Sequence, residues 1–248
     1  MKKIRYRKLD AIRGIALINM IAYHAIWDLV YLYGFQWDWY QSEIGYIWQQ
    51  GICWTFIFLS GFCCSLGSNP IKRGLTVFLA GAVITAVTLV IMPENRVVFG
   101  VLTLIGSCMI IAGVLERWLK RLTPVLGMLL SFGLFILTRN VNGGQFGFER
   151  FVLCEVEPGL YDNLVTAYVG FPAKDFYSTD YFSIIPWLFL FMTGYFLFRV
   201  LEKTKAAGTL EKSVCVPLEW LGRHSLPLYM LHQPVIYGVF ELMFRIVK

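Results

Sequence analysis

The stretch from Ala11 to Tyr33 of this 248-residue chain reads AIRGIALINMIAYHAIWDLVYLY. A helix needs about 20 mostly apolar residues to cross the hydrocarbon layer of a bilayer, and this stretch is long enough. The basic segment MKKIRYRK precedes it, as in a signal peptide. However, the apolar run is longer than a signal peptide uses, and no cleavage motif follows it. The sequence therefore predicts an uncleaved first transmembrane helix.

Six further apolar stretches in the chain have a similar length. Hydrophobic residues make up 57% of the chain and charged residues 15%, against about 25% charged in soluble domains. This composition excludes a soluble enzyme, a secreted disulfide scaffold and a nucleic-acid-binding domain. The prediction is an all-α, polytopic transmembrane bundle of about seven spans, forming a single domain over residues 1–248. The six later spans are predicted at 45–67, 73–92, 97–116, 123–138, 182–200 and 223–245.

The basic residues are distributed unequally between the two sets of connecting segments. Fourteen lie on one side of the alternating spans, including Lys2, Lys3, Lys205 and the residues around Arg117, and six lie on the other, including Lys248. Lys and Arg are retained on the cytoplasmic side of membrane proteins, so this bias predicts a cytoplasmic N-terminus. It also explains the net charge of +6 without a nucleic-acid partner. The long connection at about 139–181 then lies outside, as a lid, an acceptor-binding surface or an exposed flap.

Polar side chains form a stripe along the first predicted helix. At about 100° per residue, Asp10, Arg13, His24, Asp28 and Tyr31 fall within about 60° of one another. Ionisable groups inside a span are costly and tend to mark function. The alternative is structural: Asp10 as a helix cap, Arg13 as an interfacial cation and Asp28 as a solvated group near the outer surface.

The spacing within this stripe suggests acid–base chemistry. Asp28 lies four residues after His24, one helical turn away and within reach of the imidazole. A histidine with a carboxylate partner can serve as a general base, as attack on a thioester by an amine or hydroxyl requires. Arg13, at the cytoplasmic end, could receive a phosphorylated donor, since a guanidinium matches phosphate geometry.

Three motifs in this sequence carry a family resemblance. The first is LDAIRGIA at 9–16, followed by Tyr23-His24 and Asp28. The second is Asp180-Tyr181-Phe182 with Pro186-Trp187, and the third is LGRHSLPLY at 221–229 with His232-Gln233-Pro234. Together they resemble the bacterial membrane proteins grouped with heparan-alpha-glucosaminide N-acetyltransferase. The ten residues between Arg13 and His24 also resemble the pattern of the acyltransferase-3 membrane proteins.

The resemblance implies transfer of an acetyl or other acyl group from cytoplasmic acetyl-CoA or another acyl-CoA. The acceptor would be a sugar or cell-envelope glycan reached from the outer face. His24 is the expected catalytic residue, with Asp28 assisting, and Arg13 is expected to be tied to activity. Two departures qualify this transfer of roles: Ser183 stands where the family often has proline, and a human member relies on a histidine further along the chain.

Other polar residues are assigned more open roles. Arg223 and His224 are predicted to bind the donor at the cytoplasmic end of the last helix, with His232 lining an acyl tunnel. The alternative is a basic membrane anchor and one buried, hydrogen-bonded histidine. Asp180, Tyr31 and Gln50 are candidates for acceptor binding. Asp180 could equally cap the helix that follows it, Gln50 could lie at the membrane interface, and the aromatic residues near Tyr31 could form a belt there.

The predicted partners are acyl-CoA, a carbohydrate acceptor and the lipid bilayer, and the predicted location is the plasma membrane, as a multi-pass protein. No metal site is expected, because the sequence lacks zinc-type ligand spacing. The rival functions are a proton-coupled transporter of small solutes, using His24, Asp28 and His232 as a polar path, and a receptor without chemistry. The oligomeric state, a homodimer included, stays open.

Overall fold

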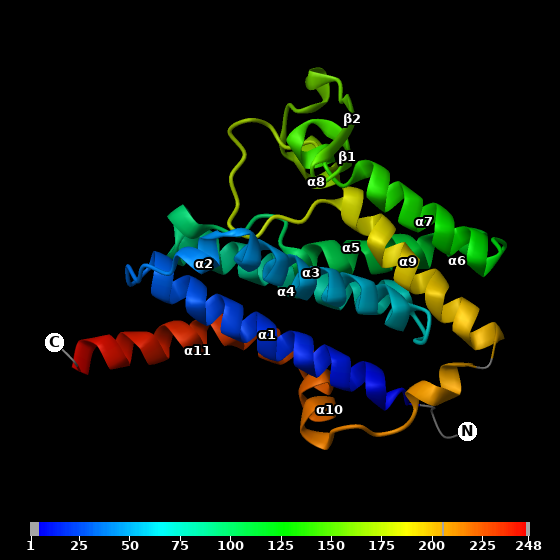
Figure 1. Ribbon diagram of the computed structural model, residues 1–248, viewed down its shortest axis with the longest axis horizontal. Coiled ribbons are helices and arrows are strands. Elements are labelled where there is room, and N and C mark those ends of the chain that lie inside the picture. Colours follow the sequence, from blue (N-terminus) through cyan, green and yellow to red (C-terminus); the bar gives the residue numbers. More distant parts are fainter. Residues whose placement is uncertain (1–4, 205, 247–248) are drawn as a thin grey trace. The chain divides into compact units, whose positions relative to one another are not determined.

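The computed structural model describes residues 5–204 and 206–246. Lys2, Lys3, Lys205 and Lys248, which contribute to the predicted charge bias, lie outside the described residues. The longer helices are α1 (Arg7–Tyr31), α3 (Glu43–Cys64), α4 (Pro70–Ile91), α5 (Val101–Val114), α7 (Pro124–Thr138), α9 (Ile184–Lys203) and α11 (Ser225–Ile246) (Figure 1). The shorter elements are α2 (Asp38–Gln41), α6 (Glu116–Leu119), α8 (Leu164–Val169), α10 (Val216–Arg223), β1 (Gln145–Phe148) and β2 (Phe151–Glu155).

Each predicted span coincides with one of the seven longer helices to within a few residues. Within the described residues, five helical segments are long and apolar enough to cross a membrane: α1, α3, α4, α9 and the segment Pro124–Gly143 that contains α7. Helix α5 is apolar but has only 14 residues. Helix α11 has 22 residues but carries His232, Gln233 and Glu241. The helical membrane class is therefore confirmed, while the number of spans and the side of the N-terminus stay predictions.

The last predicted span requires a correction at its start. The structure ends α10 at Arg223 and begins α11 at Ser225, with His224 between them. Pro227 supplies the physical reason, because it has no N–H to donate to the carbonyl group of Arg223 four residues earlier. Arg223 and His224 therefore lie at the end of a short separate helix and not on the last span.

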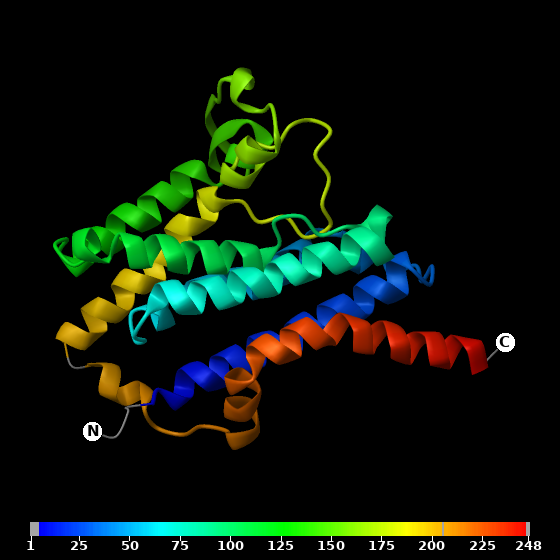
Figure 2. The ribbon, with the colours of Figure 1, turned by 180° about the vertical axis from the view of Figure 1, so that it is seen from behind.

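The chain divides into two compact units, residues 1–56 with 206–248 and residues 57–205. In the first unit, α1 packs against both α10 and α11, and both views draw the short α10 across α1 near the start of α11 (Figures 1 and 2). Leu17, Met20 and Ile52 form a buried apolar cluster there, so α1 also contacts the first part of α3.

Two glycines allow α1 and α10 to approach closely. A Cβ atom on Gly14 would overlap the carbonyl group of Leu218, and one on Gly222 would overlap the carbonyl group of Asp10. The two backbones are therefore in direct contact at both points. This contact holds the N-terminal end of α1 against the segment that carries Arg223.

In the second unit, α4 packs against α5 and α7 packs against α9. The segment at 139–181 is not a structureless loop, because it contains an antiparallel pair of strands, β1 and β2, together with α8. The pairing of Phe146 with Cys154 is followed by a register shift before Gly147. The fold is thus helical with one small two-stranded sheet, a departure from the predicted all-α composition.

The close packing of α1 on α10 leads to a stability prediction. We expect Gly14→Ala to lower the free energy of unfolding by about 1–3 kcal/mol, because the added methyl group overpacks a backbone contact. Gly238→Ala in α11 is the matched control, since its Cβ would meet no atom within 4 Å. That control should leave stability unchanged or slightly raised. Thermal unfolding in detergent measures both, and equal stability of the two variants would contradict the contact.

Candidate functional site

An ion-pair cluster lies at the N-terminal end of α1. The Asp10 carboxylate accepts a hydrogen bond from Arg5 Nε at 2.9 Å and lies 3.5 Å from Arg13 Nη1. Arg13 also donates to the carbonyl oxygen of Gly222 at 3.4 Å, which ties its guanidinium to α10. Asp10 belongs to the first turn of α1, but the residue at the helix cap is Tyr6, so Asp10 holds arginines and does not cap the helix.

Arg223 and His224 are both exposed at the end of α10. Arg223 Nε donates to the Glu219 carbonyl oxygen at 3.2 Å. The His224 ring lies 4.5 Å from the Trp220 ring, measured between centroids. Because Gly222 accepts a hydrogen bond from Arg13, the structure brings Arg13 and Arg223 to the same end of one unit.

The Glu219 carboxylate, in the first turn of α10, is buried and is held by donors from the segment before the helix. Ser213 donates its hydroxyl at 2.5 Å and Val214 its N–H at 3.0 Å. The hydrogen bond from Ser213 lowers the pKa of Glu219, so this carboxylate stays charged at neutral pH. Glu219 therefore organises the segment that carries Arg223.

Further along α1, two histidines face each other. The rings of His24 and His232 lie 4.8 Å apart between centroids, at an interplanar angle of 64°. His232 comes from α11, so the pair joins two helices from opposite ends of the chain. Nδ1 of His232 is hydrogen-bonded to the carbonyl oxygen of Tyr229, and its buried Nε2 has no partner among the described residues.

A second polar pair lies on the same two helices. The Asp28 carboxylate is fully buried and accepts a hydrogen bond from Gln233 Nε2 at 2.6 Å. The other carboxylate oxygen of Asp28 and the amide oxygen of Gln233 have no partner within the described part of the chain. The sequence predicted His24 as the partner of Asp28. In the structure Gln233 takes that place, because α11 brings its amide against α1 at this height.

Tyr31 and Gln50, two other candidates from the first unit, contact aromatic side chains. Tyr31 is 53% exposed at the end of α1, where its ring contacts the rings of Trp27 and Tyr40. The side-chain oxygen of Gln50 accepts a hydrogen bond from Trp54 on its own helix at 3.0 Å. Tyr31 therefore belongs to a group of aromatic rings, and its position at a membrane interface stays a prediction.

Two polar residues of the first unit were missed by the sequence analysis. Gln233 was noted only as part of a motif, although it holds Asp28. Asn19 accepts a hydrogen bond from Trp48 Nε1 at 3.0 Å and so connects α1 to α3. An amide within an apolar run is a sequence signal that could have indicated both, because a buried amide requires a partner.

In the second unit, Asp180 binds the start of a helix other than the one expected. Its carboxylate accepts the N–H of Val101, the first residue of α5, at 3.3 Å. A Cβ on Gly100 would come 3.0 Å from the same carboxylate. Burial raises the pKa of Asp180 to about 6, although the hydrogen bond from Val101 opposes this shift. Asp180 thus caps α5 and not α9, the helix that follows it.

Neighbouring residues fasten the same segment. Ser178 accepts the N–H of Val98 at 2.9 Å, and the Thr179 N–H donates to the Arg96 carbonyl oxygen at 3.1 Å. The Phe182 N–H donates to the Phe99 carbonyl oxygen at 2.8 Å. The cluster of capping residues at 178–180 therefore attaches the end of the long connection to the start of α5.

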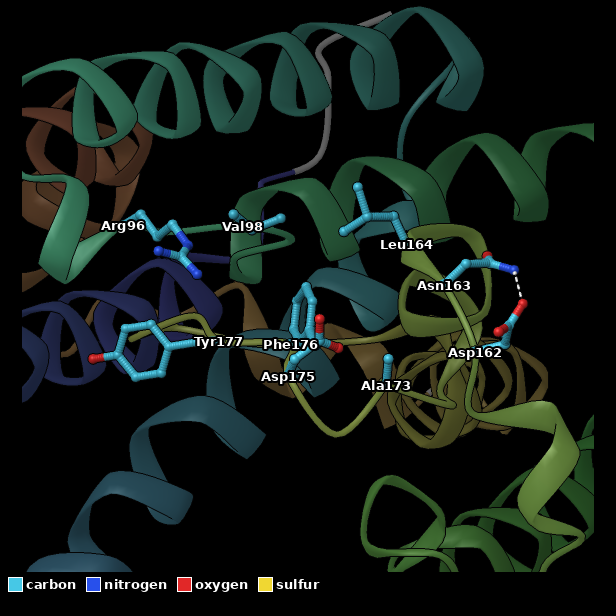
Figure 3. A pocket seen from close by; sticks show the side chains of 9 residues that line it. All are labelled: Arg96, Val98, Asp162, Asn163, Leu164, Ala173, Asp175, Phe176 and Tyr177. Atoms are coloured by element: carbon cyan, nitrogen blue, oxygen red, sulfur yellow. Dashed lines mark hydrogen bonds between the residues drawn. The ribbon is translucent and has the colours of Figure 1, made fainter.

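The second unit also contains an open pocket of about 250 Å³. Figure 3 shows Arg96 beside Tyr177 on one side, with Asp162 hydrogen-bonded to Asn163 on the other. The remaining lining residues are Val98, Leu164, Ala173, Asp175 and Phe176. This volume is below the roughly 300–1,000 Å³ of sites for drug-sized ligands. The carboxylates and aromatic rings that line the pocket are groups that bind small polar ligands.

These features define a class: a helical membrane protein with a buried cluster of histidine, aspartate and glutamine on two of its helices. Residues 5–234 match the family described as heparan-alpha-glucosaminide N-acetyltransferase, catalytic, and the chain belongs to this family. Membership makes it a membrane acetyltransferase in general terms. Neither a curated protein nor a solved structure matches the chain. The likeness to the acyltransferase-3 proteins stays a prediction.

The raised pKa of Asp180 predicts a pH dependence of stability. The folded state holds this proton more tightly than the unfolded state, whose carboxyl has a pKa near its ordinary value of 3.8. The free energy of unfolding should therefore be higher below about pH 4 and fall as the pH rises to about 6.

Two substitutions at position 180 separate titration from capping. Asp180→Asn keeps an oxygen for the Val101 N–H and should flatten the dependence between pH 4 and 6. Asp180→Ala should in addition lose about 0.5–2 kcal/mol at every pH, as expected for a lost cap. Thermal unfolding in detergent measures these effects. A pH dependence identical in wild type and Asp180→Asn would contradict the assignment.

Proposed function

We propose that this protein moves an acetyl or other acyl group from acyl-CoA on the cytoplasmic side to a sugar or cell-envelope glycan on the outer side of the plasma membrane. Family membership supports acetyl transfer in general. The donor, the acceptor and the sidedness are the proposal. The observation that carries it is the buried cluster in which His24 faces His232 and Asp28 is bound by Gln233.

The inner end of α1 suits the phosphate groups of the donor. Arg13 is held between Asp10 and the Gly222 carbonyl oxygen, so its guanidinium is oriented before a ligand arrives. Arg223 is exposed on the adjoining α10. Guanidinium groups bind phosphate through paired, charge-assisted hydrogen bonds. The predicted contribution of His224 to donor binding rests on its position beside Arg223.

The chemistry takes place at His24. The acceptor loses its O–H or N–H proton to the imidazole while its oxygen or nitrogen bonds to the carbonyl carbon of the thioester. The C–S bond breaks, and the thiolate takes the proton from the imidazolium. In the second route, His24 itself carries the acyl group before the acceptor attacks. Asp28, with one carboxylate oxygen bound by Gln233, supplies negative charge on the same helices.

The outer part of the chain is the candidate for acceptor binding. The pocket at Asp162, Asp175 and Tyr177 combines carboxylates with an aromatic ring and suits a small, hydroxyl-rich ligand. The acceptor-binding roles of Asp180, Tyr31 and Gln50 stay predictions. Their recorded contacts are those of a helix cap, an aromatic group and an intrahelical hydrogen bond.

The catalytic assignment predicts the effect of removing His24. We expect His24→Ala to lower acyl transfer at least about 100-fold, because general-base catalysis contributes about 10²–10⁴-fold. Thiol release from acetyl-CoA, measured in detergent with a panel of amino sugars and glycans, gives the rate. Ile18→Ala, at a side chain 46% exposed on the same helix, is the control for folding and should keep the wild-type rate. Full activity of His24→Ala would overturn the mechanism.

The donor site predicts a separate loss of binding. We expect Arg13→Ala to weaken acetyl-CoA binding about tenfold or more, since a hydrogen bond to a charged group contributes about 1.5–3 kcal/mol. Isothermal titration measures this affinity. Arg117→Ala removes an exposed cation from α6 and should leave the affinity unchanged.

Binding that fails altogether would redirect the assignment. If folded wild-type protein binds neither acetyl-CoA nor longer acyl-CoAs, the acyltransferase proposal is wrong. The polar path of His24, Asp28 and His232 would then favour the transporter, and solute uptake into proteoliposomes would test that function.

A further inference from the structure

His232 is hydrogen-bonded to the backbone of its own helix, α11, and this bond fixes which ring nitrogen carries the hydrogen. Nδ1 is hydrogen-bonded to the carbonyl oxygen of Tyr229. A carbonyl oxygen only accepts hydrogen bonds, so Nδ1 carries the hydrogen. In a neutral imidazole the other nitrogen then holds a lone pair. The structure thus defines the tautomer of His232, and Nε2 is a hydrogen-bond acceptor.

This acceptor is buried and unsatisfied. Nε2 of His232 has no hydrogen-bond partner within residues 5–204 and 206–246. Leaving a buried polar atom without a partner costs about 1–3 kcal/mol, so such atoms tend to mark a function. The ring centroid of His24 lies 4.8 Å away. A hydrogen bond between two imidazole nitrogens places the ring centres roughly 5 Å apart, so the observed separation of the two rings is compatible with one.

We propose that His232 is a positioning residue for His24: its Nε2 accepts the N–H of His24 and directs the other His24 nitrogen toward the reacting groups. This inference rests on the proposed acyltransferase function. His232 thereby does for His24 what the third member of a catalytic triad does for its histidine, fixing the tautomer and stabilising the charged ring. Hydrogen bonds of this kind are often longer before substrate binds.

In this arrangement the proton passes from the acceptor through His24 to the departing thiolate. It moves from the acceptor's O–H or N–H to the free nitrogen of His24 as the acceptor bonds to the carbonyl carbon. It then moves to the thiolate that is released when the C–S bond breaks. The second N–H of His24 donates to His232 Nε2 throughout. Two charged imidazoles 4.8 Å apart would repel each other, so the pair holds one extra proton at a time.

Other titratable groups surround the pair and belong in any interpretation of its pH dependence. On α1 these are Asp28 and Tyr23, whose ring lies 6.0 Å from the His24 ring. On α11 the Tyr229 ring lies 5.3 Å from the His232 ring. From α2, Tyr40 donates its hydroxyl to the Tyr23 carbonyl oxygen. From α3, Trp48 and Phe56 pack against the apolar cluster of Leu17, Met20 and Ile52, and neither side chain titrates.

Two substitutions distinguish positioning from packing. His232→Leu fills the space but cannot accept a hydrogen bond, and we expect kcat to fall about 100-fold with the KM for acetyl-CoA within about twofold. His232→Gln retains an accepting oxygen and should recover at least about tenfold of that loss. Tyr237→Phe, at an exposed position of α11, is the control and should keep the wild-type rate. A wild-type kcat in His232→Leu, or equal loss in both variants, would overturn the proposal.

A second measurement does not depend on activity. The chain has three histidines, so ¹⁵N-histidine NMR in detergent, assigned with single substitutions, can follow each ring. We expect His232 to carry its hydrogen on Nδ1, and the titration midpoint of His24 to change in His232→Leu. An unchanged His24 titration would overturn the pairing. If wild type transfers no acyl group but the two rings titrate as a pair, the proposed function fails and the coupling stands.

Discussion

The hydrogen bond from Gln233 to Asp28 is the contact on which the site depends. Asp28 is fully buried between helices, where an unpaired carboxylate costs several kcal/mol. The amide of Gln233, 2.6 Å away, offsets part of that cost and thereby fixes the height of α11 along α1. Because His232 precedes Gln233 by one residue, this one bond also places the second imidazole beside His24.

The other end of α1 is fixed by close backbone contact. Gly14 and Gly222 let α1 and α10 touch, and Arg13 bonds the carbonyl oxygen of Gly222 across the same contact. The residues predicted to bind the donor are therefore held at one end of α1, and the histidine pair is held further along it. A rigid helix joining the two is what transfer of a group from a bound donor requires, since catalytic groups must keep their geometry.

The helices could be predicted from the sequence because length and hydrophobicity are local properties. The stripe of Arg13, His24 and Asp28 on one face of α1 followed from the helical period alone. The partner of Asp28 did not, because Gln233 is 205 residues away and no local pattern specifies which helices pack together. His24, four residues before Asp28, was the nearest candidate partner in the sequence. In the structure, Gln233 on α11 donates the hydrogen bond to Asp28 instead.

The capping residues at 178–180 show a second limit of local sequence signals, because the type of interaction was predicted correctly but the helix was not. The residues at 178–180 were recognised as capping types, yet Asp180 caps α5, which precedes it by about 80 residues in the chain. The hairpin within 139–181 gave no signal, because all five residues of β2 are exposed and show no alternation of burial. By contrast, the break before α11 follows from Pro227, a local cause that the sequence analysis did not apply to Arg223.

The polar atoms left over at the centre constrain what can bind there. Asp28 Oδ2 and Gln233 Oε1 are buried, and neither has a partner among the described residues. A carboxylate oxygen and an amide oxygen only accept hydrogen bonds. With His232 Nε2 assigned to the N–H of His24, these two hydrogen-bond acceptors remain without a donor, and they favour a molecule that brings its own hydrogens, such as an alcohol or an amine. An alcohol and an amine are also the two kinds of group to which an acyl group can be transferred. The hydrogen-bond chemistry of the site therefore agrees with the acetyl transfer that the family suggests.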